Sequence, residues 1–263
     1  MGTVSEMRSG VRPSPVFLGI LGACVLLGVV TWQYGPVTMA PEMAPRLAVF
    51  GFVVTGWIVS LCLHEFGHAY LAYRSGDHTV AAKGYLGLNP LKYGDITLSF
   101  ALPVLFVLLG GIGLPGGAVW IERHRIRGRL RHSLISAAGP LANLAFAVVL
   151  ALAVTNLIHE QRGFFWSALS FLVFLQVTAA LLNLLPVPGL DGFGIIEPYL
   201  PRAWSDKAAE IGGYAFFGLI ALLWIPAINS AFFDMVFHLT DLLGVEEFPI
   251  QLGHALFRFW QNG

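Results

Sequence analysis

Charged residues are scarce in this chain. Of its 263 residues only 11% are Asp, Glu, Lys or Arg, whereas 56% are hydrophobic. A soluble domain has roughly 25% charged residues. The composition therefore excludes an ordinary soluble protein and predicts one that crosses a membrane several times. The 15 basic and 15 acidic residues balance, so nothing suggests nucleic acid as a partner.

Cysteine is also nearly absent, since the chain has only Cys24 and Cys62, both within apolar runs. Two such residues exclude a disulfide framework and a cysteine-based zinc site, and they indicate small buried hydrophobic side chains. Long polar segments, internal repeats and low-complexity tracts are missing too. Any appended soluble domain would have to fit in about 50 residues, which is fewer than a typical domain needs.

Long apolar runs are what the sequence has in abundance. Each is long enough to cross a bilayer, and they lie at 16–32, 47–73, 133–158, 164–185 and 211–233. We expect the first to be a retained span, because it is long for a signal peptide. The fold class predicted is an all-α polytopic membrane protein with about five to six transmembrane helices. The tail 234–263 forms either a further span or an interfacial segment.

The distribution of arginines predicts the orientation. Arg8 and Arg12 precede the first span, and five arginines lie within 123–131. Such clusters mark the cytoplasmic side. Residues 98–119, between the second and third spans, are apolar but rich in glycine and proline, and a full crossing there would place the arginine cluster outside. We therefore predict a re-entrant hairpin at 98–119, which is tolerated only where protein or a wet cavity covers it.

A His-Glu-x-x-His sequence, His64-Glu65-Phe66-Gly67-His68, stands inside the second apolar run. On a helix His64 and His68 lie one turn apart on one face, where two imidazoles can bind one Zn²⁺. Glu65 is then close enough to act as general base or acid on a metal-bound water. The alternative is a pair of core histidines beside a buried glutamate. Because ionisable groups in a membrane helix are expensive, we favour the functional interpretation.

A catalytic zinc usually has a third protein ligand, often a carboxylate. The acidic candidates are Asp77, Asp95, Glu160, Asp191 and Asp234. Asp77 and Asp95 have the features of solvated turn residues, Glu160 falls on the opposite side of the membrane, and Asp234 follows a run of uncertain topology. Asp191 lies at the cytoplasmic end of its span, as do the histidines, provided that 98–119 does not cross. It is therefore the predicted third ligand.

Substrate contacts are predicted at two places. Asn143 opens a span at the depth of the histidines. It either donates to a scissile carbonyl or its oxyanion, or forms a hydrogen bond between spans; the sequence leaves both interpretations open. Gly110 and Gly111 lie in the predicted hairpin, whose edge could pair with an extended substrate by strand addition.

Three motifs together resemble the site-2 protease family of intramembrane zinc metalloproteases. They are His64 to His68, Gly139-Pro140-Leu141-Ala142-Asn143, and the segment from Asn183 to Leu190-Asp191-Gly192. The likeness covers roughly 46–200 and is greatest to compact bacterial members with Gly76-Asp77 and Leu88-Asn89-Pro90-Leu91. The resemblance implies that His64, His68 and Asp191 bind zinc, that Glu65 is catalytic and that Asn143 assists with substrate. Many members of the family carry a PDZ or CBS domain, and we expect neither in this chain, because the residues outside the predicted spans are too few.

These observations predict a zinc metalloendopeptidase that hydrolyses peptide bonds in or near transmembrane segments of membrane proteins. We expect a multi-pass protein of the cell membrane, with the lipid bilayer and a transmembrane substrate as partners and the active site near the cytoplasmic side. The expected regions are 1–45 with the first span, a catalytic core at 46–200, and a transmembrane or interfacial region at 201–263. A metal transporter and an inactive metal-binding scaffold are the alternatives, and the oligomeric state stays open.

Overall fold

A computed structural model describes residues 11–39, 41–93, 119–158 and 160–261, and these residues form helices and turns with no strand among them. Within these ranges four helices are long and apolar enough to cross a membrane: α1 (Pro15–Gln33), α2 (Met43–Ser75), α5 (Arg129–Leu157) and α6 (Gly163–Leu184). A bent pair of helices brings the candidate spans in the described residues to as many as five. The predicted fold class, an all-α polytopic membrane protein, is confirmed.

Local sequence explains where these helices begin and end. The Ser14 hydroxyl accepts a hydrogen bond from the Phe17 N–H at 3.1 Å, and Pro15 occupies the first turn of α1, where its missing N–H costs nothing. Helix α2 ends at Gly76, whose φ of 117° suits glycine and few other residues. Helix α6 ends before the Pro-Val-Pro-Gly sequence 186–189, which cannot continue a helix.

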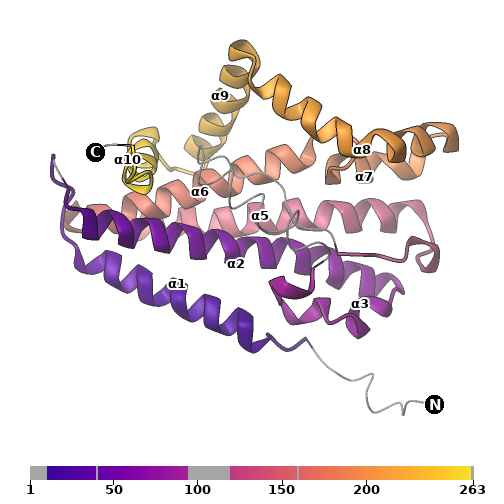
Figure 1. Cartoon of the computed structure of the whole chain (residues 1–263), viewed down its shortest axis with the longest axis horizontal. Coiled ribbons are helices and arrows are strands. Elements are labelled where there is room, and N and C mark those ends of the chain that lie inside the picture. Colours follow the sequence, from indigo (N-terminus) through magenta and orange to yellow (C-terminus); the bar gives the residue numbers. More distant parts are fainter. Residues whose placement is uncertain (1–10, 40, 94–118, 159, 262–263) are drawn as a thin grey trace.

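Helices α2, α5 and α6 form the centre of the molecule, with α1 packed along α2 (Figure 1). Helix α6 is buried along nearly its whole length. Helices α2 and α5 run antiparallel, because His68 near the end of α2 contacts Ile135 at the start of α5, whereas His64 contacts Asn143 further along. The chain therefore leaves α2 and enters α5 at the same end of the bundle. The predicted hairpin at 98–119 lies almost wholly outside the described residues.

The C-terminal part of the chain differs from a single straight span over 211–233. Helix α8 (Arg202–Leu223) and helix α9 (Pro226–Leu242) meet at a bend of 91°, and Pro226 opens α9 instead of lying inside a helix. The tail then forms α10 (Glu247–Phe257), which packs against α6 and α2. A Cβ added to Gly253 would lie 2.1 Å from the Ser167 carbonyl oxygen, so α10 and α6 touch backbone to backbone.

Short helices connect the long ones. They are α3 (Thr79–Ala82), η2 (Tyr85–Gly87), η3 (Pro90–Lys92), η5 (Arg123–Arg125), η6 (Glu160–Arg162), α7 (Asp191–Ile196) and η7 (Glu197–Tyr199). Helix α7 follows the break after α6 and packs against α5, as Figure 1 shows. This returns the chain after α6 to the end of the bundle where α2 stops and α5 starts.

Candidate metal centre

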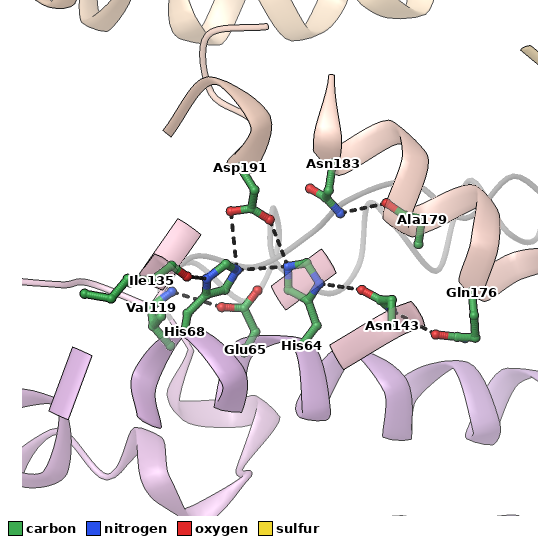
Figure 2. Close-up of polar contacts among 10 residues, drawn as sticks. All are labelled: His64, Glu65, His68, Val119, Ile135, Asn143, Gln176, Ala179, Asn183 and Asp191. Carbon is green, nitrogen blue, oxygen red and sulfur yellow. Dashed lines mark hydrogen bonds and ion pairs between the residues drawn. The ribbon is translucent and has the colours of Figure 1, made fainter. Parts of the chain in front are cut away.

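Helix α2 carries three ionisable side chains in its second half, and all three are buried. His64, Glu65 and His68 are 6%, 2% and 7% exposed. The histidine Nε2 atoms lie 3.1 Å apart, as the one-turn spacing predicts. Figure 2 shows Glu65 between the two histidines on the same helix. Burial of three such groups in a candidate membrane span requires partners, and other helices supply them.

Asp191, the first residue of α7, faces both histidines across the site (Figure 2). Its Oδ1 lies 3.3 Å from His68 Nε2 and its Oδ2 lies 3.3 Å from His64 Nε2. The structure thus brings together the three residues that the sequence proposed as metal ligands, with ligand atoms within 4.8 Å of one another. The preceding Gly189 has a φ of 95°, a conformation that few other residues adopt, and this turn aims Asp191 at the histidines.

The outward-facing nitrogens of both histidines fix which ring atom is free to bind a metal. His68 Nδ1 lies 2.7 Å from the Ile135 carbonyl oxygen, and His64 Nδ1 lies 2.5 Å from Asn143 Oδ1. A carbonyl oxygen can only accept, so each neutral ring carries its proton on Nδ1 and presents a lone pair at Nε2. This is the arrangement by which proteins orient metal-binding histidines.

The site fits a zinc ion. With both rings neutral, two Nε2 lone pairs and the Asp191 carboxylate converge, which is repulsive unless a cation lies among them. Their separations of 3.1 to 3.3 Å are close to the edge of about 3.3 Å of a tetrahedron with bonds of about 2.0 Å. Asp191 Oδ2 is also a buried atom with no hydrogen-bond partner in the described residues. Two histidines and one carboxylate form a standard zinc-binding set.

Glycines on α2 and α5 allow these two helices to approach each other closely at the site. A Cβ on Gly139 would lie 2.2 Å from His68 Nε2 and 2.5 Å from His64 Nε2. A Cβ on Gly67 would lie 2.8 Å from the Ala138 carbonyl oxygen. Only glycine leaves room at these points, so the Gly-Pro sequence that the resemblance used has a direct steric reason.

Asn143 is buried between three helices, and both ends of its amide are engaged. Its Oδ1 accepts from His64 on α2, and its Nδ2 donates to Gln176 Oε1 on α6 at 2.8 Å. These contacts are those of the hydrogen bond between spans, one of the two interpretations left open by the sequence. A contact between Asn143 and substrate stays a prediction. Gln176, which is 0% exposed, was not predicted from the sequence, although a glutamine within an uncharged span was a signal for it.

The other acidic candidates lie elsewhere. Asp77 was expected to be a solvated turn residue. It does bond Thr79 in its own turn, but the solvated position is wrong: the residue is fully buried, and its second carboxylate oxygen accepts from the Glu122 N–H. Asp234 is exposed on α9, and it is not part of the metal-binding group found in the described residues. Asp95, Gly110 and Gly111 lie outside those residues, so their predicted roles are unaffected.

Comparison with known proteins places this architecture in a family. No family model and no solved structure matches the chain. The chain is 44% identical over 257 residues to the "Putative zinc metalloprotease Rip2" of Mycolicibacterium smegmatis, covering 98% of each protein. It is 45% identical over 253 residues to Rip2 of Mycobacterium tuberculosis H37Rv, covering 96% of each.

A more distant relative is the "Putative zinc metalloprotease YwhC" of Bacillus subtilis, 32% identical over 198 residues, which are 72% of this chain and 88% of YwhC. The likeness to Rip2 extends over nearly the whole length, spans and site alike. With the motifs that resemble site-2 proteases and the convergence of His64, His68 and Asp191, it leads to one conclusion: the chain belongs to the site-2 protease-like family that includes Rip2 and YwhC.

Proposed function

We propose that this protein is a zinc metalloendopeptidase that hydrolyses peptide bonds in or near transmembrane segments of membrane proteins. The observation that carries the proposal is the convergence of His64, His68 and Asp191 beside Glu65, within a helix that is a candidate membrane span. The names of the relatives, "Putative zinc metalloprotease Rip2" and "Putative zinc metalloprotease YwhC", support the same class of enzyme.

His64, His68 and Asp191 would hold the zinc ion, which when bound would polarise a water molecule and the scissile carbonyl. Glu65 is the residue that moves the proton: its carboxylate takes one from the attacking water and delivers one to the leaving amine. The Val119 N–H donates to Glu65 Oε2 at 3.1 Å, which leaves the other carboxylate oxygen for the proton transfer. Burial of Glu65 keeps bulk water from competing for it.

A membrane substrate agrees with where these residues lie. The histidines are in the second half of α2, a few turns from its end at Ser75, so water can reach the site from that end of the bundle. A substrate helix hides its carbonyl oxygens in hydrogen bonds four residues apart. It must unwind locally before a carbonyl can reach the site, and we expect unwound or glycine- and proline-containing segments to be cleaved.

We place the site near the cytoplasmic face. The exposed arginines Arg127, Arg129 and Arg131 lie where α5 begins, and α5 begins at the end of the bundle where α2 stops. Basic residues next to membrane spans favour the cytoplasmic side. Labelling of single cysteines at 78–93 and at 124–130 should therefore report the cytoplasmic side for both segments. Labelling from opposite sides would contradict this placement.

The metal-transporter alternative has less support. Ion paths through membranes use successive polar sites, whereas the described residues contain a single group of three or more metal-binding side chains. Glu65 between the two histidines is the arrangement of a hydrolase. Uptake of ⁶⁵Zn into vesicles that contain the purified protein would separate the two functions.

The decisive experiment compares the wild-type protein with E65Q. Both are expressed in cells that lack the endogenous gene, membrane-protein fragments are identified by proteomics, and the purified proteins are analysed for metal. We expect zinc in both and substrate fragments with the wild type alone. Identical fragments from both proteins would show that this chain is not the protease.

A further inference from the structure

The segment 119–125 contacts Glu65 beside the metal centre and, on its other side, the element that follows the helix of Asp191. On one side its backbone N–H groups donate to Glu65 on α2 and to Asp77, which follows the end of α2. On the other side the Arg123 guanidinium bonds Glu197 in η7, directly after the helix that begins with Asp191. This segment has little secondary structure of its own apart from η5, so its conformation depends on these contacts.

The main anchor of this segment is Asp77. Its Oδ1 accepts from the Thr79 N–H at 3.0 Å and from the Thr79 hydroxyl at 2.6 Å, which is an ordinary turn contact. Its Oδ2 reaches further and accepts from the Glu122 N–H at 2.8 Å. A residue that only closed its own turn would need just the first oxygen. Asp77 is 0% exposed, so both contacts are shielded from water.

The charge state of Asp77 suits this role. Burial alone would raise the pKa of the carboxyl group. The hydrogen bonds from the Thr79 hydroxyl, the Glu122 N–H and the Thr79 N–H outweigh burial and hold the pKa of Asp77 below its ordinary value. The side chain is therefore a carboxylate at neutral pH, and charge-assisted bonds of this kind are stronger than neutral ones.

Three residues before Glu122, the Val119 N–H donates to Glu65 Oε2. The path from Asp77 to Glu65 thus consists of one side-chain bond, a three-residue stretch of backbone, and one backbone bond. The stretch is further fixed because Lys83 Nζ lies 3.2 Å from the Trp120 carbonyl oxygen and 3.7 Å from Glu122 Oε1. If the Asp77 contact is lost, the donor to Glu65 loses its support.

We propose that Asp77 is a positioning residue for proton transfer: by holding the Glu122 N–H it keeps the Val119 N–H on one oxygen of Glu65 and thereby orients the other oxygen for the reaction. The proposal rests on the proposed function, because it assigns to Glu65 the proton transfer described above. This role also explains why the Gly76-Asp77 pair directly follows α2. Gly76 allows the turn, and Asp77 ties the turn to the segment that supports Glu65.

The test removes the two partners of the Asp77–Glu122 bond separately. D77A removes the acceptor. E122P removes the donor, and the φ of −83° at residue 122 lies close to what proline requires. E122A is the matched comparison, since it loses the same carboxylate as E122P but keeps the N–H. Turnover is measured on a purified quenched-fluorescence reporter with one helix-destabilised transmembrane segment, together with zinc content and the thermal midpoint.

We expect D77A and E122P to lower kcat about 10–100-fold, the usual effect of removing a residue that orients a site. KM and zinc content should be unchanged, and E122P should be slower than E122A by the same factor. The double variant D77A/E122P should be no slower than the slower of the two single variants, because both substitutions break the same Asp77–Glu122 bond. D77N keeps one acceptor oxygen and should lie between D77A and the wild type.

Three outcomes would overturn the proposal. The first is wild-type kcat in both D77A and E122P. The second is loss of zinc together with a lower thermal midpoint in both, which indicates a purely structural role. The third is a multiplicative effect in the double variant. If D77A fails to fold, the comparison of E122P with E122A decides alone. E65Q is assayed in parallel: an active E65Q removes the proposed function, whereas an inactive E65Q beside fully active D77A and E122P removes only the role of Asp77.

Discussion

The two halves of helix α2 are held in place by different physical means. The first half packs through aromatic rings. The ring centroids of Phe50 and Phe257 of α10 lie 5.2 Å apart, and those of the stacked pair Phe52 and Phe165 of α6 lie 5.4 Å apart. The second half also packs apolar side chains, Val59, Cys62 and Ala69 among them, but it adds directed hydrogen bonds between helices. These run from His64 to Asn143 and from His68 to the Ile135 carbonyl. One continuous helix therefore joins a region of shape-based packing to a region of polar contacts.

This difference separates stability from chemistry. Apolar packing is non-directional and tolerates small rotations of a ring. A buried hydrogen bond fixes both distance and angle, and an unpaired partner is costly. Substitutions at contacts of the first half of α2 should thus lower the stability of the protein and leave the metal centre intact. Substitutions at contacts of the second half should instead alter metal binding or catalysis. The following predictions test this contrast, beginning with the largest effect.

Loss of Asp191 should have the largest effect. D191A leaves two histidines, too few to hold zinc at a catalytic site, so we expect loss of both zinc and proteolysis by metal analysis and reporter cleavage. D191C should retain zinc, because a thiolate is also a good ligand. D234A, at an exposed carboxylate outside the metal-binding group, is the control and should keep both. Full zinc occupancy in D191A would show that the third ligand lies elsewhere.

E65Q should separate metal binding from catalysis. The three ligand residues remain, so zinc content should match the wild type, while turnover falls by about 10²–10⁴-fold, the usual contribution of a general acid–base group. Stopped or continuous assays of the quenched reporter measure the fall. If zinc disappears along with activity, Glu65 is a ligand or a structural residue, and its proposed role is wrong.

G139A tests the close approach of α5 to the histidines. The added Cβ would lie 2.2 Å from His68 Nε2, so the helix or the imidazole must shift. We expect zinc affinity to fall by about 10–100-fold or more, comparable with the loss of an orienting contact, as measured by competition with a chelator. G213A is the control, since a Cβ there meets nothing within 4 Å. Equal affinities in the two variants would show that Gly139 has no steric role.

Q176L should give a smaller loss at the same site. The leucine fills similar space but leaves the Asn143 Nδ2 without its 2.8 Å acceptor, so the amide can turn away from His64. Zinc affinity should fall by about 10-fold, at the lower end for an outer partner of a metal-binding histidine. T178V on the same helix should have no such effect, because Thr178 bonds only its own helix, at the Phe174 carbonyl. An unchanged zinc affinity in Q176L would show that Asn143 orients His64 without help from Gln176.

F257A belongs to the other half of the comparison and should have the smallest effect on chemistry. Phe257 is 0% exposed and packs on Phe50 and Phe171. Its truncation should lower the free energy of unfolding by about 3–5 kcal/mol, measured in detergent by denaturant titration, with zinc content and kcat of the folded fraction preserved. F248A, at a 72% exposed ring, should change little. A metal-free F257A would show that the two halves of α2 are coupled.

Much of the fold and the centre of the site could be predicted from the sequence because they depend on local rules. Uninterrupted apolar runs gave the first, second, third and fourth spans, and the one-turn spacing of His64 and His68 placed both on one face. Asp191 was singled out because the predicted topology placed it at the same end of the membrane as the histidines. The solvated position predicted for Asp77 was wrong, because its neighbours look like a turn and nothing local reveals that Glu122 donates to it from 45 residues away.

The sequence by itself determined the all-α membrane architecture and the histidine pair, because hydrophobicity and helical periodicity act within one segment. The tertiary structure alone decided which atoms meet: Gln176 with Asn143, Gly139 against the histidines, Asp77 with the Glu122 N–H, and α10 against α6. These contacts join segments far apart in the chain, and they depend on helix rotation and on distances below 3 Å. An apolar run specifies neither, because many rotations bury the same hydrophobic surface, and only the joint packing of all the helices selects one.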